Sequence, residues 1–565
     1  MVWSLLLIAG SEGPPLISFV VPHLLCSWYV RGTRSGSVFG YRVFRPDELP
    51  PRVYANTTAR RKIKPSRASA CIDQKSRFRH HSLSGNAADL DSSEDGSSIS
   101  MDRRGEQIIS TWKRACFPKQ NGSKFPEPTR SGELKNCWWR LLAATLLVAG
   151  LLTPRTTGAY SVFTHEELID LTWPTAIRPL LLRRFPGTTP AQLRIAHAFA
   201  YGGCDAQDLG YYPFGNRFFS DLTHYVRTGD FINNLLLQAH DVNEYAFAIG
   251  AMSHYVGDSI GHSEVMNPAT GVNFPKLAKK YGPDVTYDED EHAYASTEFS
   301  FDVEQLSKRT LAPTAYMRYI GFRTPRELLE RAFVATYGID VRELVGRVLP
   351  AMRSYRSSVR TLIPAFANAE VVLHGKQFAP DTPGPAYDTF VNQLKKAEFE
   401  RHWAYTYKNP GIGPHLLAIV IKIIPKIGPA SDLAIRIPNK QTEEWYIESV
   451  DHSADVYRLL LADLSANPRG TLKLANLDLD TGKKVRPGGY ALTDKTYAQL
   501  VQRLTADPNR TIPKGLQDDI LDYYADPNAP IRTKRNHRKW KRLMAELETL
   551  KKMKVASAAA VARSD

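Results

Sequence analysis

Helical periodicity of apolar residues dominates the chain from residue 160 to about residue 365. The segments AQLRIAHAFAYGG (191–203) and YAFAIGAMSHYVGD (245–258) repeat apolar residues every three to four positions, as one face of a helix requires. No part of this region shows a convincing alternation of apolar and polar residues over the length of a strand. The pattern therefore predicts a mainly α domain, a helical bundle with polar loops between its helices.

Three helix starts are predicted from N-cap patterns. Thr164–Glu167 and Thr189–Gln192 have the form of a capping box, and Asp241–Glu244 has an aspartate in the same role. Pro190 occupies the favoured first position of the second helix, which we expect to end at Gly202 and Gly203. The first of these patterns places His165 in the opening turn of its helix.

Beyond residue 365 the pattern stays largely helical, without a repeat that indicates a role. Residues 438–464 predict a long amphipathic helix, and HLLAIVIKIIP (415–425) predicts a buried helix or strand. Residues 467–515 are rich in turn-forming sequence, including DLDTGKKVRPGGY. The segment 534–554 predicts an amphipathic basic helix, with one face that carries Trp540, Leu543, Met544, Leu547 and Leu550.

The formal charge of +15 is concentrated at the two ends of the chain. Residues 1–159 carry 23 basic and 12 acidic residues, and residues 532–554 carry ten and two, so that residues 160–531 come to about −4. The body of the protein is therefore not a nucleic-acid-coating surface, and no stable nucleic-acid complex is expected. The basic helix near the C-terminus is expected to dock on the protein; peripheral contact of 532–554 with an anionic membrane is the alternative.

An internal signal peptide is predicted at residues 135–159. Lys135 and Arg140 precede an uncharged run of twelve residues, Leu141–Leu152, and a small, polar segment ends at Ala159. Cleavage there predicts an exported protein, periplasmic or extracellular, with Cys204 as its one cysteine. A buried core helix is the alternative reading of the apolar run. Residues 1–134 lack periodicity and are predicted to be a disordered extension, or one that arises from a start codon placed too far upstream.

Three potential metal ligands follow one another at helical spacing in HYVGDSIGH. His254, Asp258 and His262 lie at i, i+4 and i+8, and each step of four advances a side chain by only about 40°. A polar stripe on a surface helix is the plain explanation, and a metal site is the alternative. Further candidates gather in the same region, all imidazole or carboxylate: His165, Asp205, Asp208, His224, His292 and Glu298.

This donor set indicates zinc. Imidazole and carboxylate ligands leave coordination positions open for water, as catalytic zinc sites do, and no CxxC pair is present to form a thiolate zinc finger. Clustered metal ions can bind a phosphate ester, generate hydroxide and stabilise the leaving oxygen. Each residue taken alone also has a structural explanation, as a core histidine or a turn aspartate. The order of the whole set is the more specific observation.

That order resembles the zinc-dependent phospholipase C family over residues 160–302. The matching segments are YSVFTHEELI, QDLGYYPFGNRFFSDLTHY and HYVGDSIGH. The family includes glycosylphosphatidylinositol phospholipase D and is structurally akin to the single-strand-specific zinc nucleases, and the wording of the segments resembles a bacterial exported subgroup. The resemblance implies an all-α bundle that holds one to three zinc ions and hydrolyses a phosphodiester, often at a phospholipid headgroup.

Carried over residue by residue, the resemblance implies the ligands His165, Asp208, His224, His254, Asp258 and His262. Asp205 competes with Asp208 and is the alternative base or orienting residue. The family closes its set with a late His-x-x-x-Glu, but His292 and Glu298 are six residues apart and would diverge by about 120° on one helix. Tyr294 occupies the position four before Glu298. Either His292 ligates from a loop before the helix, or one metal is missing.

These observations predict a signal peptide at 135–159, a phospholipase C-like helical domain at 160–365 and a mostly helical region of unknown role at 366–565. The predicted function is that of a secreted zinc-dependent phosphodiester hydrolase, with Asp208 or Asp205 as the residue that orients water. A zinc nuclease on the same fold is one alternative, for which Tyr211, Tyr212, Phe214 and Phe218 would offer stacking surfaces. A binding protein that retains the bundle without turnover is the other.

Overall fold

The computed structural model describes residues 5–8, 16–21, 24–33, 36–44, 161–344, 348–378, 380, 384–423, 435–467 and 471–556. The chain divides into two units, residues 2–138 and residues 139–565, and each is considered by itself. The signal segment predicted at 135–159 lies outside the described residues, so cleavage and export stay predictions. Among the described helices, none combines the length and the apolar character that crossing a bilayer requires.

The described part of the first unit is a four-stranded antiparallel sheet. Its strands lie in the order β1-β2-β3-β4: β1 (Leu5–Ile8), β2 (Leu16–Val21), β3 (Leu24–Thr33) and β4 (Gly36–Phe44). The sequence pattern predicted no strand here, because these apolar runs do not alternate. Strands β2 and β3, and likewise β3 and β4, pair antiparallel and are only two residues apart in the sequence, a spacing typical of β-hairpins. The description of residues 1–134 as a dispensable extension stays a prediction.

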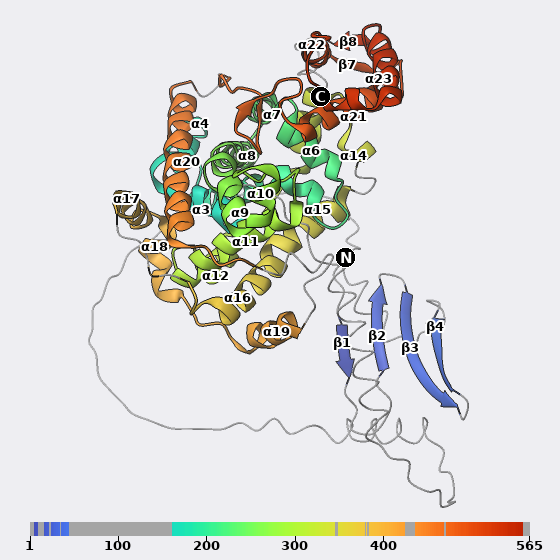
Figure 1. Cartoon of the computed structure of the whole chain (residues 1–565). Helices are drawn as coiled ribbons and strands as arrows, with labels where there is room; N and C mark the ends of the chain where they lie inside the picture. The colour runs from blue at the N-terminus through green and yellow to red at the C-terminus, as the bar shows by residue number, and fades with distance from the viewer. Residues whose placement is uncertain are drawn as a thin grey trace, which may run out of the picture. The chain divides into compact units, whose positions relative to one another are not determined.

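The second unit is an all-α bundle, as predicted, with four short strands near its C-terminal end (Figure 1). The helices before residue 360 are α3 (Val162–Thr172), α4 (Arg178–Arg184), α5 (Pro190–Gly203), α6 (Arg217–Tyr225), α7 (Thr228–Leu237), α8 (Val242–Gly261), α9 (Asn267–Asn273), α10 (Pro275–Tyr281), α11 (Glu291–Lys308), α12 (Thr314–Ile320), α13 (Arg326–Tyr337), α14 (Val341–Leu344) and α15 (Val348–Ser357).

The later helices are α16 (Ile363–His374), α17 (Pro385–Leu394), α18 (Glu398–Trp403), α19 (Ile412–Ile423), α20 (Lys440–Ala466), α21 (Ala491–Thr505), α22 (Lys514–Tyr523) and α23 (His537–Leu550). Strands β5 (Leu477–Asp478) and β6 (Lys483–Lys484) form an antiparallel hairpin, and β7 (Thr511–Pro513) pairs with β8 (Lys554–Ala556) in parallel. Helix α16 runs through residue 365, so the predicted boundary there does not coincide with the end of an element.

Helix α8 is the central helix of the bundle. It contacts α3, α5, α7 and α20, so elements from both halves of the unit pack against it. Every residue from Tyr245 to Asp258 is buried. A helix buried on all sides belongs to the core. The stripe of His254 and Asp258 therefore does not face solvent, which removes the plain explanation of a polar stripe on a surface helix.

Two of the three predicted helix starts are confirmed. Thr189 and Gln192 form a reciprocal capping box before α5, and the Asp241 side chain accepts hydrogen bonds from two backbone N–H groups at the start of α8. The first prediction is wrong, because α3 begins at Val162, and Thr164 lies inside it. The Thr164 hydroxyl instead donates to Asp302 Oδ1 at 2.7 Å, a partner 138 residues away that local pattern does not reveal.

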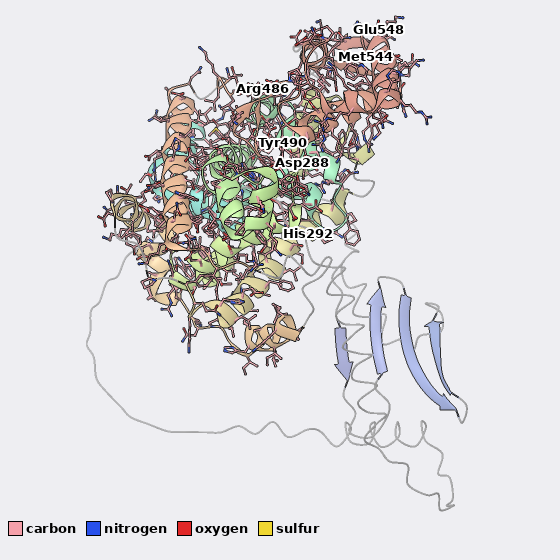
Figure 2. The ribbon with its side chains drawn as sticks, in the orientation of Figure 1. Asp288, His292, Arg486, Tyr490, Met544 and Glu548 are labelled. Atoms are coloured by element: carbon pink, nitrogen blue, oxygen red, sulfur yellow. The ribbon has the colours of Figure 1, made fainter. Side chains whose placement is uncertain are left out.

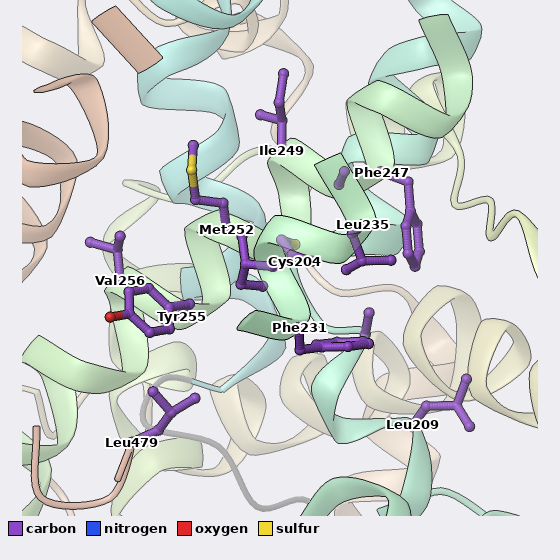
Figure 3. Close-up of a cluster of buried hydrophobic side chains, with 14 of the residues drawn as sticks. Cys204, Leu209, Phe231, Leu235, Phe247, Ile249, Met252, Tyr255, Val256 and Leu479 are labelled. Atoms are coloured by element: carbon purple, nitrogen blue, oxygen red, sulfur yellow. The ribbon is translucent and has the colours of Figure 1, made fainter. Parts of the chain in front are cut away.

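Helices α5 and α8 approach each other closely through glycines. A Cβ atom on Gly250 of α8 would lie 2.1 Å from the carbonyl oxygen of Ala200, and one on Gly203 of α5 would lie 2.1 Å from the carbonyl oxygen of Phe247. Only glycine permits backbones to come this close. Figure 3 shows the apolar side chains that fill the neighbouring core, including Cys204, Phe247 and Met252. The contact fixes where α8 presents the polar residues of its C-terminal half.

The two apolar segments of the C-terminal half behave differently. In α23 the side chains of Leu543, Leu547 and Leu550 are buried, so the helix docks on the protein as expected. Helix α19 buries Ala418 and Ile421 beside α16. Within the segment predicted to be buried, Leu416 is 59% exposed and Ile419 is 56% exposed, so one face of the helix differs from the prediction. Lys422 interrupts the apolar run, and the helix continues through it to Ile423.

Candidate metal centre

A buried carboxylate on α8 lies at the centre of four imidazoles. Asp258 Oδ1 is 3.3 Å from His165 Nε2 on α3. Its Oδ2 is 3.0 Å from His254 Nε2, 3.3 Å from His224 Nε2 on α6 and 3.5 Å from His262 Nε2. All five side chains are at most 2% exposed. The structure thus brings together, around one carboxylate, residues spread over almost 100 positions of the chain.

Backbone carbonyl groups fix the orientation of two of these imidazoles. His254 Nδ1 lies 2.9 Å from the carbonyl oxygen of Cys204, and His224 Nδ1 lies 2.8 Å from that of Ser220. A carbonyl oxygen only accepts, so each Nδ1 carries a hydrogen and donates it. A ring whose Nε2 carries no proton then presents the Nε2 lone pair to the centre, which is the arrangement found in metal-ligating histidines.

The two Nε2 atoms then face each other. His224 Nε2 and His254 Nε2 are 3.3 Å apart. Two lone pairs at this distance repel unless a proton or a metal ion lies between them or beside them. Because both rings are buried, water does not relieve this contact from outside. This pair is the observation that most directly indicates a cation-binding centre.

The loop that precedes α6 supplies a second carboxylate. Asp208, in a single 3-10 turn (Gln207–Tyr211), places Oδ1 3.3 Å from His224 Nε2. Asp205 Oδ2 instead accepts the hydroxyl of Tyr212 at 2.7 Å. The structure therefore places Asp208 among the donors and Asp205 behind it, where a tyrosine orients its carboxyl group.

Two groups of donors have the spacing that a metal ion requires. One consists of His165, His254 and Asp258, the other of Asp208, His224 and His254, and in each the ligand atoms lie within 4.8 Å of one another. Ligand atoms at about 2.0–2.1 Å from a tetrahedral zinc lie roughly 3.3 Å from each other. The distances of 3.0–3.3 Å in these groups fit that geometry. His254 belongs to both groups, and its one Nε2 lone pair can bind one ion, so the two groups are alternative ligand sets around that ion.

The charges of the centre are strongly coupled. Burial opposes protonation of His224, but the carboxylates of Asp208 and Asp258 outweigh it and raise the pKa of His224 well above its usual value. Burial also opposes ionisation of Asp258, yet the neighbouring imidazoles, His254 first, hold its pKa well below the ordinary range. Burial, and then His254, lower the pKa of His165. The centre thus favours an ionised Asp258 beside positive charge, which a protonated His224 or a bound metal ion would supply.

The late residues of the set are separated by the structure. His262 begins a π-helical turn (His262–Met266) after α8, and its Nδ1 contacts the hydroxyl of Tyr294, whose ring stacks on the imidazole. Helix α11 begins at Glu291, so His292, labelled in Figure 2, is helical and does not lie in a preceding loop. It lines a surface hollow together with Phe274. Glu298 is buried on the same helix as Tyr294.

Several residues at the centre are absent from the sequence-based set. A cavity too small for a water molecule adjoins the imidazoles and is lined by Tyr211, His224, Tyr225, His262, Tyr287, Tyr294 and Asp480. Of the tyrosines, Tyr211 is a predicted stacking surface and Tyr294 stands four positions before Glu298, but no sequence pattern indicates Tyr225 or Tyr287. Asp480 comes from the C-terminal half, and the one local signal for it is the turn sequence DLDTG. No periodicity could connect it with α8.

Fold and donor set together define an all-α protein with a buried histidine and aspartate metal centre. Residues 164–344 match the family model described as zinc dependent phospholipase C, so this segment is similar to that family. The matched segment includes every candidate metal ligand described above except Asp480. No curated protein and no solved structure matches the chain. The family implies zinc as the metal, and the buried donors of the centre fit that ion.

Proposed function

We propose that this protein is an exported, zinc-dependent phosphodiester hydrolase of the phospholipase C type. The observation that carries the proposal is the pair of facing Nε2 atoms of His224 and His254, 3.3 Å apart, beside the ionised carboxylate of Asp258. When bound, zinc would polarise a phosphoryl oxygen and lower the pKa of a water molecule. The remaining chemistry is assigned to side chains of this chain.

Side chains that converge on the centre would hold the ion. His165, His254 and Asp258 offer one set of ligand atoms, and Asp208 with His224 extends it. Backbone carbonyls hold the imidazoles of His224 and His254, so the geometry of these two rings exists before the ion binds. A phosphodiester anion would be drawn to this positive centre rather than to a basic surface patch.

Asp205 is suited to a proton-handling role behind the ligands. Burial, and then the charge of Asp208, raise the pKa of Asp205 well above its ordinary value. The Tyr212 hydroxyl donates a hydrogen bond to Asp205 Oδ2, while Asp205 Oδ1 is buried and makes no hydrogen bond within the described residues. A carboxyl group with a raised pKa can exchange a proton near neutral pH. Asp205 would thus orient a water molecule or hold its proton while Asp208 ligates.

The tyrosine-lined cavity supports a headgroup substrate. Faces of Tyr211, Tyr225 and Tyr287 around a positively charged substituent offer cation–π contacts. The cavity has no room for a water molecule, whereas ligand sites typically offer roughly 300 Å³, so side chains must move for a diester to enter. The same rings could stack on bases, which keeps nuclease activity as the second candidate. The slightly acidic body favours the small phosphodiester.

Export and membrane contact complete the proposal. A mature N-terminus near Tyr160 would place the bundle in the periplasm or outside the cell. Helix α23 turns its leucines inward and exposes basic side chains, among them Arg538 and Lys541. That face would contact an anionic lipid surface by charge rather than by insertion.

The decisive assay is hydrolysis by the full chain purified with zinc. We expect turnover of p-nitrophenylphosphocholine and slower turnover of bis(p-nitrophenyl) phosphate, both lost on chelation and restored by zinc. Single-stranded DNA is the comparison substrate, and faster cleavage of DNA would move the assignment to the nuclease. Zinc-loaded protein that cleaves none of the three would overturn the proposal and favour a binding protein.

A further inference from the structure

A hairpin from the C-terminal half closes over the metal centre. Strands β5 and β6 are joined by Leu479–Gly482, outside the segment that matches the family model. The backbone N–H of Leu479 donates to the carbonyl oxygen of His224 at 3.0 Å, and Asn267 Nδ2 donates to the carbonyl oxygen of Asp480 at 2.9 Å. The hairpin is therefore hydrogen-bonded to an element that carries a donor and to helix α9.

Packing holds the same hairpin against α8. Leu479 is fully buried in one apolar cluster with Tyr255 and Val256 (Figure 3). At the end of the turn, Gly482 has a φ of +66°, and a Cβ atom there would lie 2.2 Å from the carbonyl oxygen of Ser259. Only glycine satisfies both requirements. These contacts fix the position of the turn relative to the last residues of α8.

The turn directs one carboxylate into the centre. Asp480 is 2% exposed, and its Oδ2 accepts the hydroxyls of Tyr225 at 2.9 Å and Tyr490 at 2.6 Å. The Tyr490 hydroxyl in turn accepts the backbone N–H of Asp288 at 3.1 Å, which leaves its hydrogen for Asp480 (Figure 2). With Oδ2 occupied, Oδ1 is the oxygen that faces the centre, 3.8 Å from His262 Nε2.

His262 Nε2 lies between two carboxylates without a hydrogen bond to either. It is 3.5 Å from Asp258 Oδ2 and 3.8 Å from Asp480 Oδ1, and it is buried with no hydrogen-bond partner. These distances are long for a hydrogen bond, yet close to the separation of roughly 3.3 Å between ligands of one tetrahedral ion. An ion pair alone would be expected to draw the groups together.

We infer that Asp480 supplies a carboxylate ligand to a metal ion held with His262, so that the C-terminal half completes the metal centre. This inference rests on the proposed function, because it requires that the centre binds zinc. Asp480 would take the place of the imidazole that the late motif lacks, where Tyr294 stands instead. The segment 164–344 would then be an incomplete site without the hairpin.

Zinc binding by matched variants tests the inference. Asp480→Asn keeps the shape and an acceptor for the tyrosine hydroxyls but weakens ligation. The control is Asp478→Asn, since Asp478 is equally buried yet accepts from the Thr493 hydroxyl at 2.8 Å, outside the centre. We expect Asp480→Asn to lose one equivalent of zinc or to bind it at least tenfold more weakly, and Asp478→Asn to match the wild type.

Cobalt spectroscopy separates a ligand from a residue that only positions His262. Asp480→Cys, loaded with Co²⁺, should show a thiolate-to-cobalt charge-transfer band that Asp478→Cys lacks. Unchanged zinc binding in Asp480→Asn, or no such band in Asp480→Cys, would overturn the inference while the wild type still binds zinc. A wild-type chain that binds no zinc would overturn the proposed function itself.

Discussion

Replacing Asp258 with asparagine is expected to abolish zinc binding and to lower phosphodiester hydrolysis at least about a thousandfold, some 4 kcal/mol of transition-state stabilisation. The two oxygens of Asp258 lie within 3.5 Å of four imidazole Nε2 atoms, so this substitution affects all four histidines of the centre. An asparagine retains the size but removes the charge and one acceptor. The measurement is zinc content by elemental analysis, together with the rate on p-nitrophenylphosphocholine.

The control for this variant is a buried aspartate that also contacts a histidine. Asp170 lies 3.2 Å from His197 Nε2 and accepts the Tyr201 hydroxyl at 2.6 Å, but it belongs to neither donor group. Asp170→Asn should lower the melting temperature and leave zinc content unchanged. At a free zinc concentration one hundred times the dissociation constant, zinc binding adds about 2.7 kcal/mol to the free energy of unfolding. Added zinc should therefore stabilise the control but not Asp258→Asn. Equal zinc content in both variants would contradict the assignment.

Gly250→Ala is expected to destabilise the fold by about 3 kcal/mol, although it adds only one methyl group. Its Cβ would lie 2.1 Å from the carbonyl oxygen of Ala200, so α5 and α8 must separate. The separation would also lengthen the contact between His254 Nδ1 and the carbonyl oxygen of Cys204, and zinc affinity should fall. Thermal unfolding should show a lower midpoint, by about 5 °C or more.

The matched control is a helical glycine with open space around it. Gly413 in α19 has no atom within 4 Å of an added Cβ, and alanine is favoured over glycine in helices by about 1 kcal/mol. Gly413→Ala should therefore be neutral or slightly stabilising. If Gly250→Ala unfolds at the wild-type temperature, the close packing of α5 on α8 does not hold.

The sequence predicted what local periodicity and the family resemblance encode. The stripe of His254 and Asp258 follows from helical spacing, and the Thr189 and Asp241 caps follow from short-range hydrogen bonding. The preference for Asp208 over Asp205 came from the resemblance, and the structure places Asp208 beside His224. These features depend on residues close together in the chain, or on the order of a known set.

Long-range contacts were beyond that reasoning. The local sequence predicts Thr164 as a helix N-cap, but its hydroxyl donates to Asp302, 138 residues away. Asp480 lies in a turn whose sequence carries no mark of a ligand, and only the docking of the hairpin on α8 brings it to His262. The stacking of Tyr294 on His262 likewise depends on the packing of α11 beside the π-helical turn.

Anomalous diffraction at the zinc edge, from crystals of the zinc-loaded chain, tests the central claim most directly. The account predicts a zinc peak within coordination distance of His254 Nε2 that is shared with His224 and Asp208, or with His165 and Asp258. Asp205 should lie outside the coordination sphere. Crystals of zinc-loaded protein with no peak among these donors, or with zinc bound only elsewhere, would contradict it.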